Sequence, residues 1–104
     1  MTNLHLTLKK KWFDAIASGA KRNEYREDKP YWRSRLTKVN PMDGRLCFRK
    51  FDQVIFKNGY GKNAPRMTLW CLGIELFSGY VEGLSGGKAG LYFNIKLGSV
   101  VEAA

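Results

Sequence analysis

Two apolar runs in the last third of the chain most constrain what this sequence can fold into. In residues 91–97 the apolar side chains Leu91, Phe93, Ile95 and Leu97 recur at every second position, which is the period of a strand with one buried face. In residues 67–76 both phases are apolar, which predicts a central strand buried on two sides. Strands of this kind must pair with others, so the sequence predicts a fold built on a sheet.

The N-terminal part of the chain predicts a strand followed by one short helix. Residues 4–8 alternate between apolar and polar side chains, which is typical of a half-buried strand. Apolar residues at three- and four-residue spacing then indicate a helix: Trp12, Phe13, Ile16 and Ala17. We interpret Trp12 and Phe13 as core anchors. The helix should end at Gly19, because glycine readily takes the left-handed conformation that follows a helical last turn.

Further along, three more segments carry local signals. Residues 31–36 predict a second short helix with Asp28 as its N-cap and Pro30 in its first turn. Residues 52–57 are β-branched and aromatic and predict a strand. Residues 79–90 hold five glycines and predict a mobile loop.

These segments together predict the fold class. The chain has 104 residues, which is enough for one core and too few for two, so residues 1–104 should form a single domain. About five to six short strands with two small helices, and no regular alternation of strand and helix, predict an α+β fold, a small mixed β-barrel.

The charge balance of the chain indicates an anionic partner. Lys and Arg number 18 against 9 Asp and Glu, which gives a net charge of +9. A pI near 9.8 is typical of nucleic-acid-binding domains, although a basic protein without such a partner is the alternative. The sequence shows no long apolar run, no long basic amphipathic helix and no signal peptide, so we expect a cytoplasmic protein with no membrane partner.

No cofactor or metal is expected from the sequence. The two cysteines, Cys47 and Cys71, lie in apolar strand-like contexts far apart in the chain. Together with the single His5 they cannot supply the usual four ligands of a zinc site. We therefore expect both to be buried free thiols in a reducing compartment.

Residues 19–26 are the first candidate binding motif, with the pattern Gly-x-Lys-x-x-Glu-x-Arg. If the segment after the helix is extended, Glu24 and Arg26 project to the same side, and Lys21 can turn toward that side from the bend. A carboxylate between two cations on one surface forms either a plain ion pair or an anion-binding pocket in which the carboxylate holds the two cations in place. The basic balance of the chain favours the pocket.

Residues 58–66 are the second candidate motif. Asn58 begins an Asn-Gly-Tyr-Gly turn whose glycines allow a ligand to approach the backbone, and Tyr60 offers a ring for stacking on a base. Lys57 and Arg66 flank the turn with positive charge. The alternative is a simple hairpin, because Asn-Gly between two strands is a common two-residue turn.

The order of these motifs resembles the ASCH domain family of the PUA-like superfamily, and within it the small single-domain members of bacterial or phage type. The resemblance covers residues 4–97, from the first strand and the Lys-Trp-Phe helix to the final strand. It implies a PUA-like barrel with a cleft that binds an RNA segment, a nucleotide or a modified nucleoside. The residues implied are Lys21, Glu24 and Arg26, beside the Asn58 and Tyr60 turn, with Lys57 and Arg66 in support.

The resemblance also implies an alternative, because some ASCH proteins are amidohydrolases that deacetylate acetylcytidine. Their catalytic set is a Lys, a Thr three residues on and a later Glu. Here Lys21 matches but Glu24 occupies the Thr position, and only Glu75 and Glu82 lie near as second carboxylates. If the chain is an enzyme, Lys21 and Glu24 would be its catalytic residues, with Glu24 as general base toward water. An RNA-cleaving activity is a further alternative.

Overall fold

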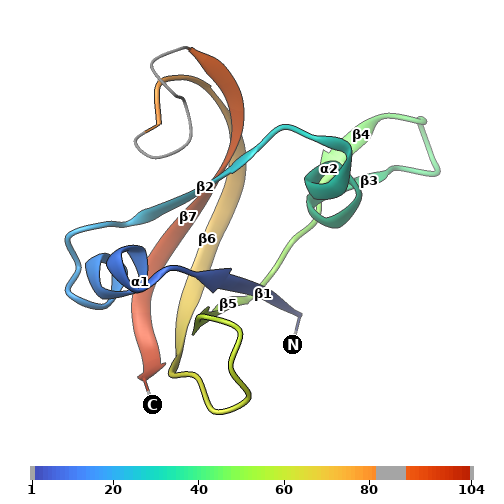
Figure 1. The fold of residues 1–104 in the computed structure, drawn as a ribbon. Helices are drawn as coiled ribbons and strands as arrows, with labels where there is room; N and C mark the ends of the chain where they lie inside the picture. The colour runs from blue at the N-terminus through green and yellow to red at the C-terminus, as the bar shows by residue number, and fades with distance from the viewer. Residues whose placement is uncertain (1, 82–88, 104) are drawn as a thin grey trace.

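The computed structural model describes residues 2–81 and 89–103, which form two helices and seven strands (Figure 1). The elements, in chain order, are β1 (Asn3–Leu8), α1 (Lys10–Ala17), β2 (Asn23–Glu27), α2 (Pro30–Leu36), β3 (Thr37–Val39), β4 (Leu46–Phe48), β5 (Gln53–Asn58), β6 (Arg66–Gly79) and β7 (Gly90–Ala103).

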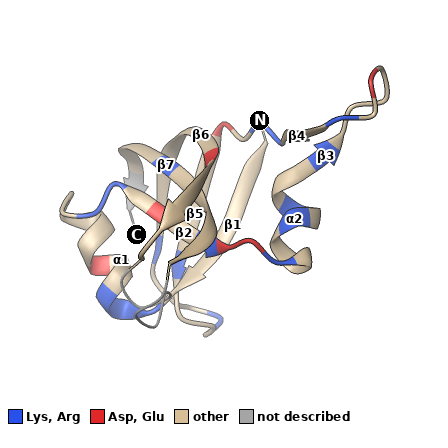
Figure 2. Cartoon of the chain, turned by 90° about the horizontal axis from the view of Figure 1, so that it is seen from above, with Lys and Arg blue, Asp and Glu red and all other residues tan. Residues whose placement is uncertain are grey.

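Five strands make one mixed sheet in the order β1-β5-β6-β7-β2, and β3 pairs with β4 in a separate ribbon. β1 runs parallel to β5, while the other neighbouring strands of the large sheet are antiparallel. In Figures 1 and 2, α1 lies to one side of the large sheet, and α2 with the β3–β4 ribbon stands to the other. The described residues therefore form an α+β fold, as the sequence predicts.

The core lies between the inward faces of these strands and the two helices. Its members come from every element of the large sheet except β2 and from both helices: Leu4, Leu6, Leu8, Ile16, Leu36, Val54, Phe56, Met67, Leu69, Phe93, Ile95 and Leu97. Most of these residues occupy alternate positions of their strands, because successive strand side chains point to opposite faces. The alternation predicted for residues 4–8 is confirmed in β1. The alternation predicted for residues 91–97 holds only in part: Phe93, Ile95 and Leu97 are buried in β7, but Leu91 is 55% exposed, and Tyr92 and Asn94 of the opposite phase are buried as well.

The prediction that residues 67–76 are buried on both sides is wrong. β6 is central, since it pairs with β5 and β7, and Met67 and Leu69 are buried. On the opposite phase Ile74 packs against the core, but Trp70, Leu72 and Leu76 keep 41%, 66% and 57% of their surface exposed. Ile16 of α1 and Leu36 of α2 belong to the same core cluster as Met67 and Leu69, so the buried residues of both helices share the core with this phase of β6.

The predicted N-cap of the second helix is also wrong. The residue at the N-cap of α2 is Lys29, and its side chain makes no capping hydrogen bond. Asp28 instead accepts hydrogen bonds from Nε and Nη2 of Arg33 at 2.5 and 2.9 Å. A two-bonded guanidinium satisfies a carboxylate better than a backbone N–H does, so the ion pair takes the place of the cap.

This ion pair predicts a dependence of stability on pH. The hydrogen bond from Arg33 holds the pKa of the Asp28 carboxyl below its ordinary value of 3.8. A carboxyl whose pKa is lowered in the folded state stabilises the fold at pH values above its ordinary pKa. That stability is lost as the pH falls through the folded-state pKa. We therefore expect Asp28→Asn to lower the free energy of unfolding at neutral pH, and the difference from wild type to shrink below about pH 4.

Urea unfolding of the two proteins across this pH range measures the effect. Arg33→Met removes the donor of the same pair and should give the same pH dependence. A difference between Asp28→Asn and wild type that stays constant down to the lowest pH would show that the Arg33 contact does not stabilise the charged carboxylate.

The structure bears on whether the large sheet closes into the predicted barrel. The large sheet has five strands among the described residues, and no backbone ladder joins its edge strands β1 and β2 there, so a closed barrel is not confirmed. A side-chain contact does cross between these edges, because Nη2 of Arg26 in β2 donates to the Thr7 carbonyl of β1 at 3.2 Å.

Of the glycine-rich loop predicted at 79–90, residues 82–88 lie outside the described part of the chain.

Candidate functional site

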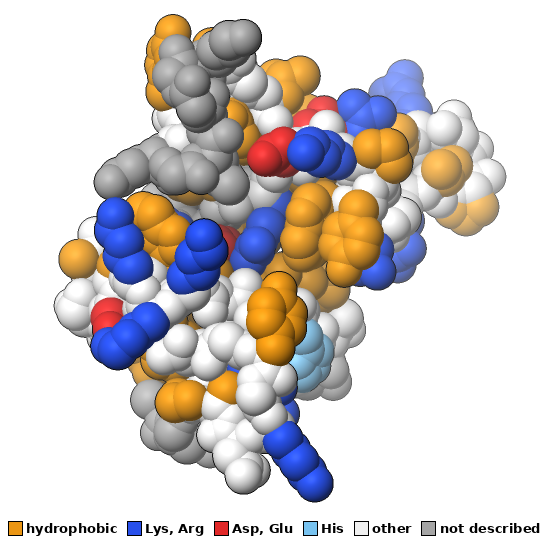
Figure 3. All heavy atoms as spheres, viewed as in Figure 1, with side chains coloured by type: hydrophobic (Ala, Val, Ile, Leu, Met, Phe, Trp, Pro, Cys, Tyr) orange, Lys and Arg blue, Asp and Glu red, His pale blue; other side chains and the backbone are white. Residues whose placement is uncertain are grey.

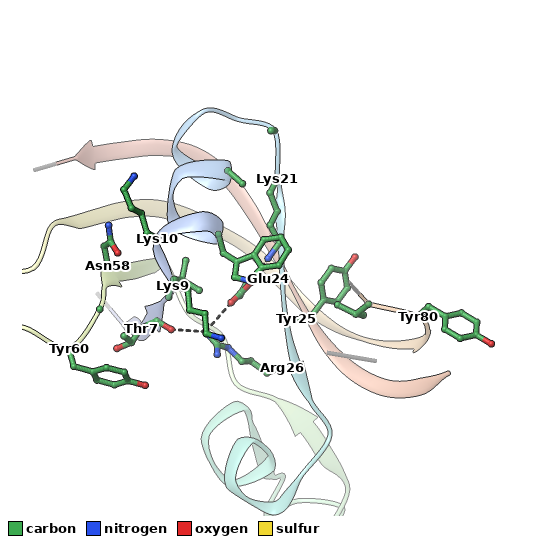
Figure 4. Close-up of a pocket in the computed structure, with 16 residues that line it drawn as sticks. Thr7, Lys9, Lys10, Lys21, Glu24, Tyr25, Arg26, Asn58, Tyr60 and Tyr80 are labelled. Carbon is green, nitrogen blue, oxygen red and sulfur yellow. Dashed lines mark hydrogen bonds and ion pairs between the residues drawn. The ribbon is translucent and has the colours of Figure 1, made fainter. Parts of the chain in front are cut away.

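A pocket of about 800 Å³ lies where the edge strands β1 and β2 approach each other (Figure 4). Its walls come from the end of β1, from α1, from β2, from the loop after β5 and from the residues that follow β6. The volume lies within the range typical of small-molecule sites. Both candidate motifs of the sequence contribute to it.

Glu24 forms the charged centre of this pocket. Its Oε1 accepts from Nζ of Lys21 at 2.5 Å, and its Oε2 lies 2.9 Å from Nη2 of Arg26. Glu24 is only 5% exposed, so its carboxylate is removed from water and depends on these two cations. The arrangement predicted from residues 19–26, one carboxylate between two cations on one surface, is therefore present.

Local structure places the three side chains. α1 ends before Gly19, whose φ of +82° is the left-handed conformation that glycine takes without steric cost. The backbone N–H of Lys21 then donates to the Ala15 carbonyl at 3.0 Å, which holds the bend against the helix. From there β2 is extended, so Glu24 and Arg26 project to the same face by simple alternation.

Arg26 connects the pocket to both edges of the sheet. Besides Glu24 it contacts the Thr7 carbonyl, and its guanidinium carbon lies 5.0 Å from the centroid of the Trp32 ring in α2. Its Nε is buried and has no hydrogen-bond partner among the described residues. An unpaired buried donor costs free energy, so this atom is a place where a ligand acceptor would be favoured.

Aromatic rings surround this charged centre. The Lys21 ammonium lies 4.8 Å from the centroid of the Trp12 ring, which is cation–π distance. Tyr25 lines the pocket and packs against Phe77 with ring centroids 5.4 Å apart. Tyr60 and Tyr80 are 90% and 68% exposed and stand on either side of the pocket in Figure 4. The pocket thus combines positive charge with accessible π-faces.

The loop after β5 is tied to β1 rather than closed as a tight turn. β5 and β6 do form an antiparallel hairpin, but seven residues, 59–65, connect them instead of two. Gly59 has a φ of +85°, and its N–H donates to the Leu8 carbonyl at 3.0 Å. This contact carries Asn58 and Tyr60 to the rim of the pocket.

The structure brings together five of the seven predicted site residues. Those that line the pocket are Lys21, Glu24, Arg26, Asn58 and Tyr60. Lys57 and Arg66 do not line it: they face each other across the β5–β6 ladder, beside the pocket. The sequence indicated these two residues because they flank the Asn-Gly-Tyr-Gly segment. In the structure they form a cross-strand pair of the β5–β6 hairpin and do not reach the pocket lining.

Sequence reasoning missed several lining residues. Trp12, which we predicted to be a core anchor, packs against the core and also forms part of the pocket wall. Lys9 and Lys10 belong to a basic cluster directly before α1, and this cluster was the signal that could have indicated them. Thr7 and Tyr80 carry no local signal, because only the fold brings their segments to the pocket.

The second carboxylates considered for catalysis do not complete the site. Glu75 lies in β6, where it pairs with Lys96 at 3.1 Å and accepts from Asn94 at 3.2 Å, away from the pocket lining. Glu82 lies outside the described residues. Glu24 is therefore the one carboxylate that lines the pocket in the described part of the chain.

The described residues contain no group of three or more His, Cys, Asp or Glu side chains that could hold a metal ion. Both cysteines are free and half-buried, and burial raises the pKa of the Cys71 thiol. Among the helices described, none has the length and apolar character needed to cross a membrane. Comparison of the chain with models of protein families, with curated proteins and with solved structures gave no match.

Proposed function

We propose that this chain is an RNA- or nucleotide-binding domain of the ASCH type, a PUA-like barrel whose edge strands meet at the pocket. The observation that carries the proposal is the buried Glu24 held between Lys21 and Arg26 inside a pocket with aromatic walls. In this arrangement the carboxylate orients two cations toward the space where a ligand would lie. It also supplies an acceptor for a base amino group.

The charge of the lining supports an anionic ligand. Four cations line the pocket against the single carboxylate of Glu24: Lys9, Lys10, Lys21 and Arg26. One of them, Lys10, is partly neutralised by Asp14 at 2.5 Å, and the others leave a net positive field in a concave site. Such a field concentrates phosphate groups and accelerates their binding.

The aromatic side chains support a ligand that carries a base as well as a phosphate. Trp12, Tyr25, Tyr60 and Tyr80 all contribute to the lining. Stacking of a base on such a ring contributes about 1–3 kcal/mol in proteins that bind single strands. A site for a simple inorganic anion would gain nothing from these four rings.

The hydrolase alternative has one feature in its favour, which is the contact of Lys21 with Glu24 in the pocket. Two features favour binding over hydrolysis. Each oxygen of Glu24 already contacts a cation, so neither oxygen is placed to take a proton from an attacking water without giving up an ion pair. The Thr that lies three residues after the Lys in the deacetylating ASCH proteins is also missing here, because Glu24 occupies that position.

Substitution of Lys21 tests the proposed function. We expect Lys21→Met to weaken binding of ribonucleoside 5′-monophosphates by about tenfold or more, because a charge-assisted contact to phosphate is lost. Arg22→Met is the matched control, since Arg22 is the next residue, is exposed and does not line the pocket. Isothermal titration at two salt concentrations measures both variants.

Equal affinity in Lys21→Met and wild type would contradict the proposed site. The same proteins should also be incubated with acetylcytidine while cytidine is followed by chromatography. We expect no turnover. Release of cytidine by the wild type that disappears in Lys21→Met would make the chain an amidohydrolase instead.

A further inference from the structure

The positive charge of this chain is concentrated away from the pocket. Residues 29–50 contain seven Lys and Arg and one Asp, so their net charge is +6 out of +9 for the whole chain. These residues form α2, β3 and β4, and we call them the arm. Figure 2 shows basic residues along α2 and β3, on the opposite side of the molecule from α1.

Most of this charge has no internal counter-charge. Lys29 pairs with Glu27 at 2.8 Å, and Arg33 pairs with Asp28 at 2.5 Å. The remaining cations are exposed and make no ion pair within the described part of the chain: Arg35, Lys38, Arg45, Arg49 and Lys50. Five unpaired cations on a short segment repel one another, so an external polyanion would relieve that repulsion.

The register of the ribbon gathers three of these cations on one face. Lys38 faces Cys47 across the β3–β4 ladder, and backbone hydrogen bonds made by the N–H groups of Asn40 and Arg49 continue the pairing beyond both ends. Arg45 and Arg49 directly flank β4, each two positions from Cys47, so the alternation of an extended segment places them on the face of Cys47. Lys38 projects to that same face because it lies opposite Cys47.

Two aromatic rings between two cations lead from the pocket along α2. The guanidinium carbon of Arg26 lies 5.0 Å from the Trp32 ring, and the rings of Trp32 and Tyr31 are 4.8 Å apart. At the far end, the guanidinium carbon of Arg35 lies 3.5 Å from the Tyr31 ring. Tyr31 is 56% exposed. In Figure 3, hydrophobic and basic side chains lie next to one another across the middle of the visible face.

We propose that the ligand is a single nucleic-acid strand several nucleotides long rather than a free nucleoside. One nucleotide occupies the pocket, a neighbouring base stacks on Tyr31, and the following phosphates contact Arg35 and the ribbon cations Lys38, Arg45 and Arg49. This inference rests on the proposed function of the pocket. Exposed rings that stack on bases, combined with cations that contact phosphates, are the means by which single strands are bound without regard to sequence.

Two probes and two arm variants test the inference. The probes are ribonucleoside 5′-monophosphates, which fit the pocket alone, and an unstructured RNA of about 12 nucleotides, within the site sizes of single-strand binders. For the RNA, we expect Tyr31→Ala to weaken binding by about tenfold, while Tyr31→Phe retains it. Lys38→Ala with Arg45→Ala should lower the log–log salt slope by about 1.4, for two lost phosphate contacts. Monophosphate binding should be unchanged in every arm variant.

The matched control for charge is Lys62→Ala with Lys96→Ala, which also removes two cations but lies outside the arm and the pocket lining. Thermal melting checks that each variant is folded. An arm variant that binds the RNA as wild type does would overturn the inference and leave the proposed function intact, as would equal losses in the arm and control variants. Failure of the wild type to bind either probe would reject both the pocket and the arm.

Discussion

Replacing Glu24 with alanine is expected to lower the free energy of unfolding by about 2–4 kcal/mol, because two cations then lose their shared counter-charge. The side chains of Lys21 and Arg26 are only 23% and 21% exposed. Water can therefore partly solvate these two cations once Glu24 is removed. The loss of unfolding free energy is for this reason somewhat smaller than for breaking a fully buried pair. Denaturant unfolding at neutral pH measures the change.

Glu27→Ala is the matched control for this substitution. Glu27 lies on the same strand and pairs with Lys29, but its side chain is 38% exposed, so we expect a much smaller loss. Glu24→Gln should fall between the two, since the amide oxygen can still accept from one cation. Wild-type stability in Glu24→Ala would show that the pocket forms without its internal carboxylate.

Replacing Phe56 with alanine is expected to cost about 3–5 kcal/mol of unfolding free energy, because it removes a buried ring and leaves a cavity. Phe56 is completely buried in β5, between its neighbours Leu6 in β1 and Met67 in β6. Four residues later, Tyr60 is 90% exposed, and Tyr60→Ala should change stability by less than about 0.5 kcal/mol.

These two substitutions should separate stability from binding. Tyr60→Ala should weaken binding of a nucleotide by removing a stacking surface, although it hardly alters unfolding. Phe56→Ala should unfold earlier in denaturant yet bind normally at temperatures where it remains folded. If Tyr60→Ala bound nucleotides with wild-type affinity, the ring would be an exposed side chain without a role in the pocket.

The position of the pocket follows from the open edges of the large sheet. β1 and β2 are its two outer strands, and each carries backbone groups on one side that no neighbouring strand pairs within the described residues. Arg26 meets one such group, the Thr7 carbonyl, with a side chain. A charged side chain that bridges the two edges holds them close without backbone hydrogen bonds between them, which leaves room for a ligand.

The charged centre of the site was predictable because its geometry is local. Lys21, Glu24 and Arg26 lie within six residues, and their relative directions depend only on a helix that ends at Gly19 and an extended segment after it. Both signals are short-range: the spacing of apolar residues in α1 and the alternation of side chains in β2. The α+β class was predictable for the same reason, since each strand and helix carries its own period.

What lies around that centre depended on contacts between distant segments. Thr7 and Tyr80 reach the pocket only because the fold brings the end of β1 and the residues that follow β6 to the same pocket as β2, and no local pattern predicts that arrangement. Asp28 had two possible partners, the backbone of α2 and the Arg33 guanidinium, and the stronger charge-assisted pair prevailed. Periodicity determines which residues share a face, whereas the register and order of the strands determine what that face meets.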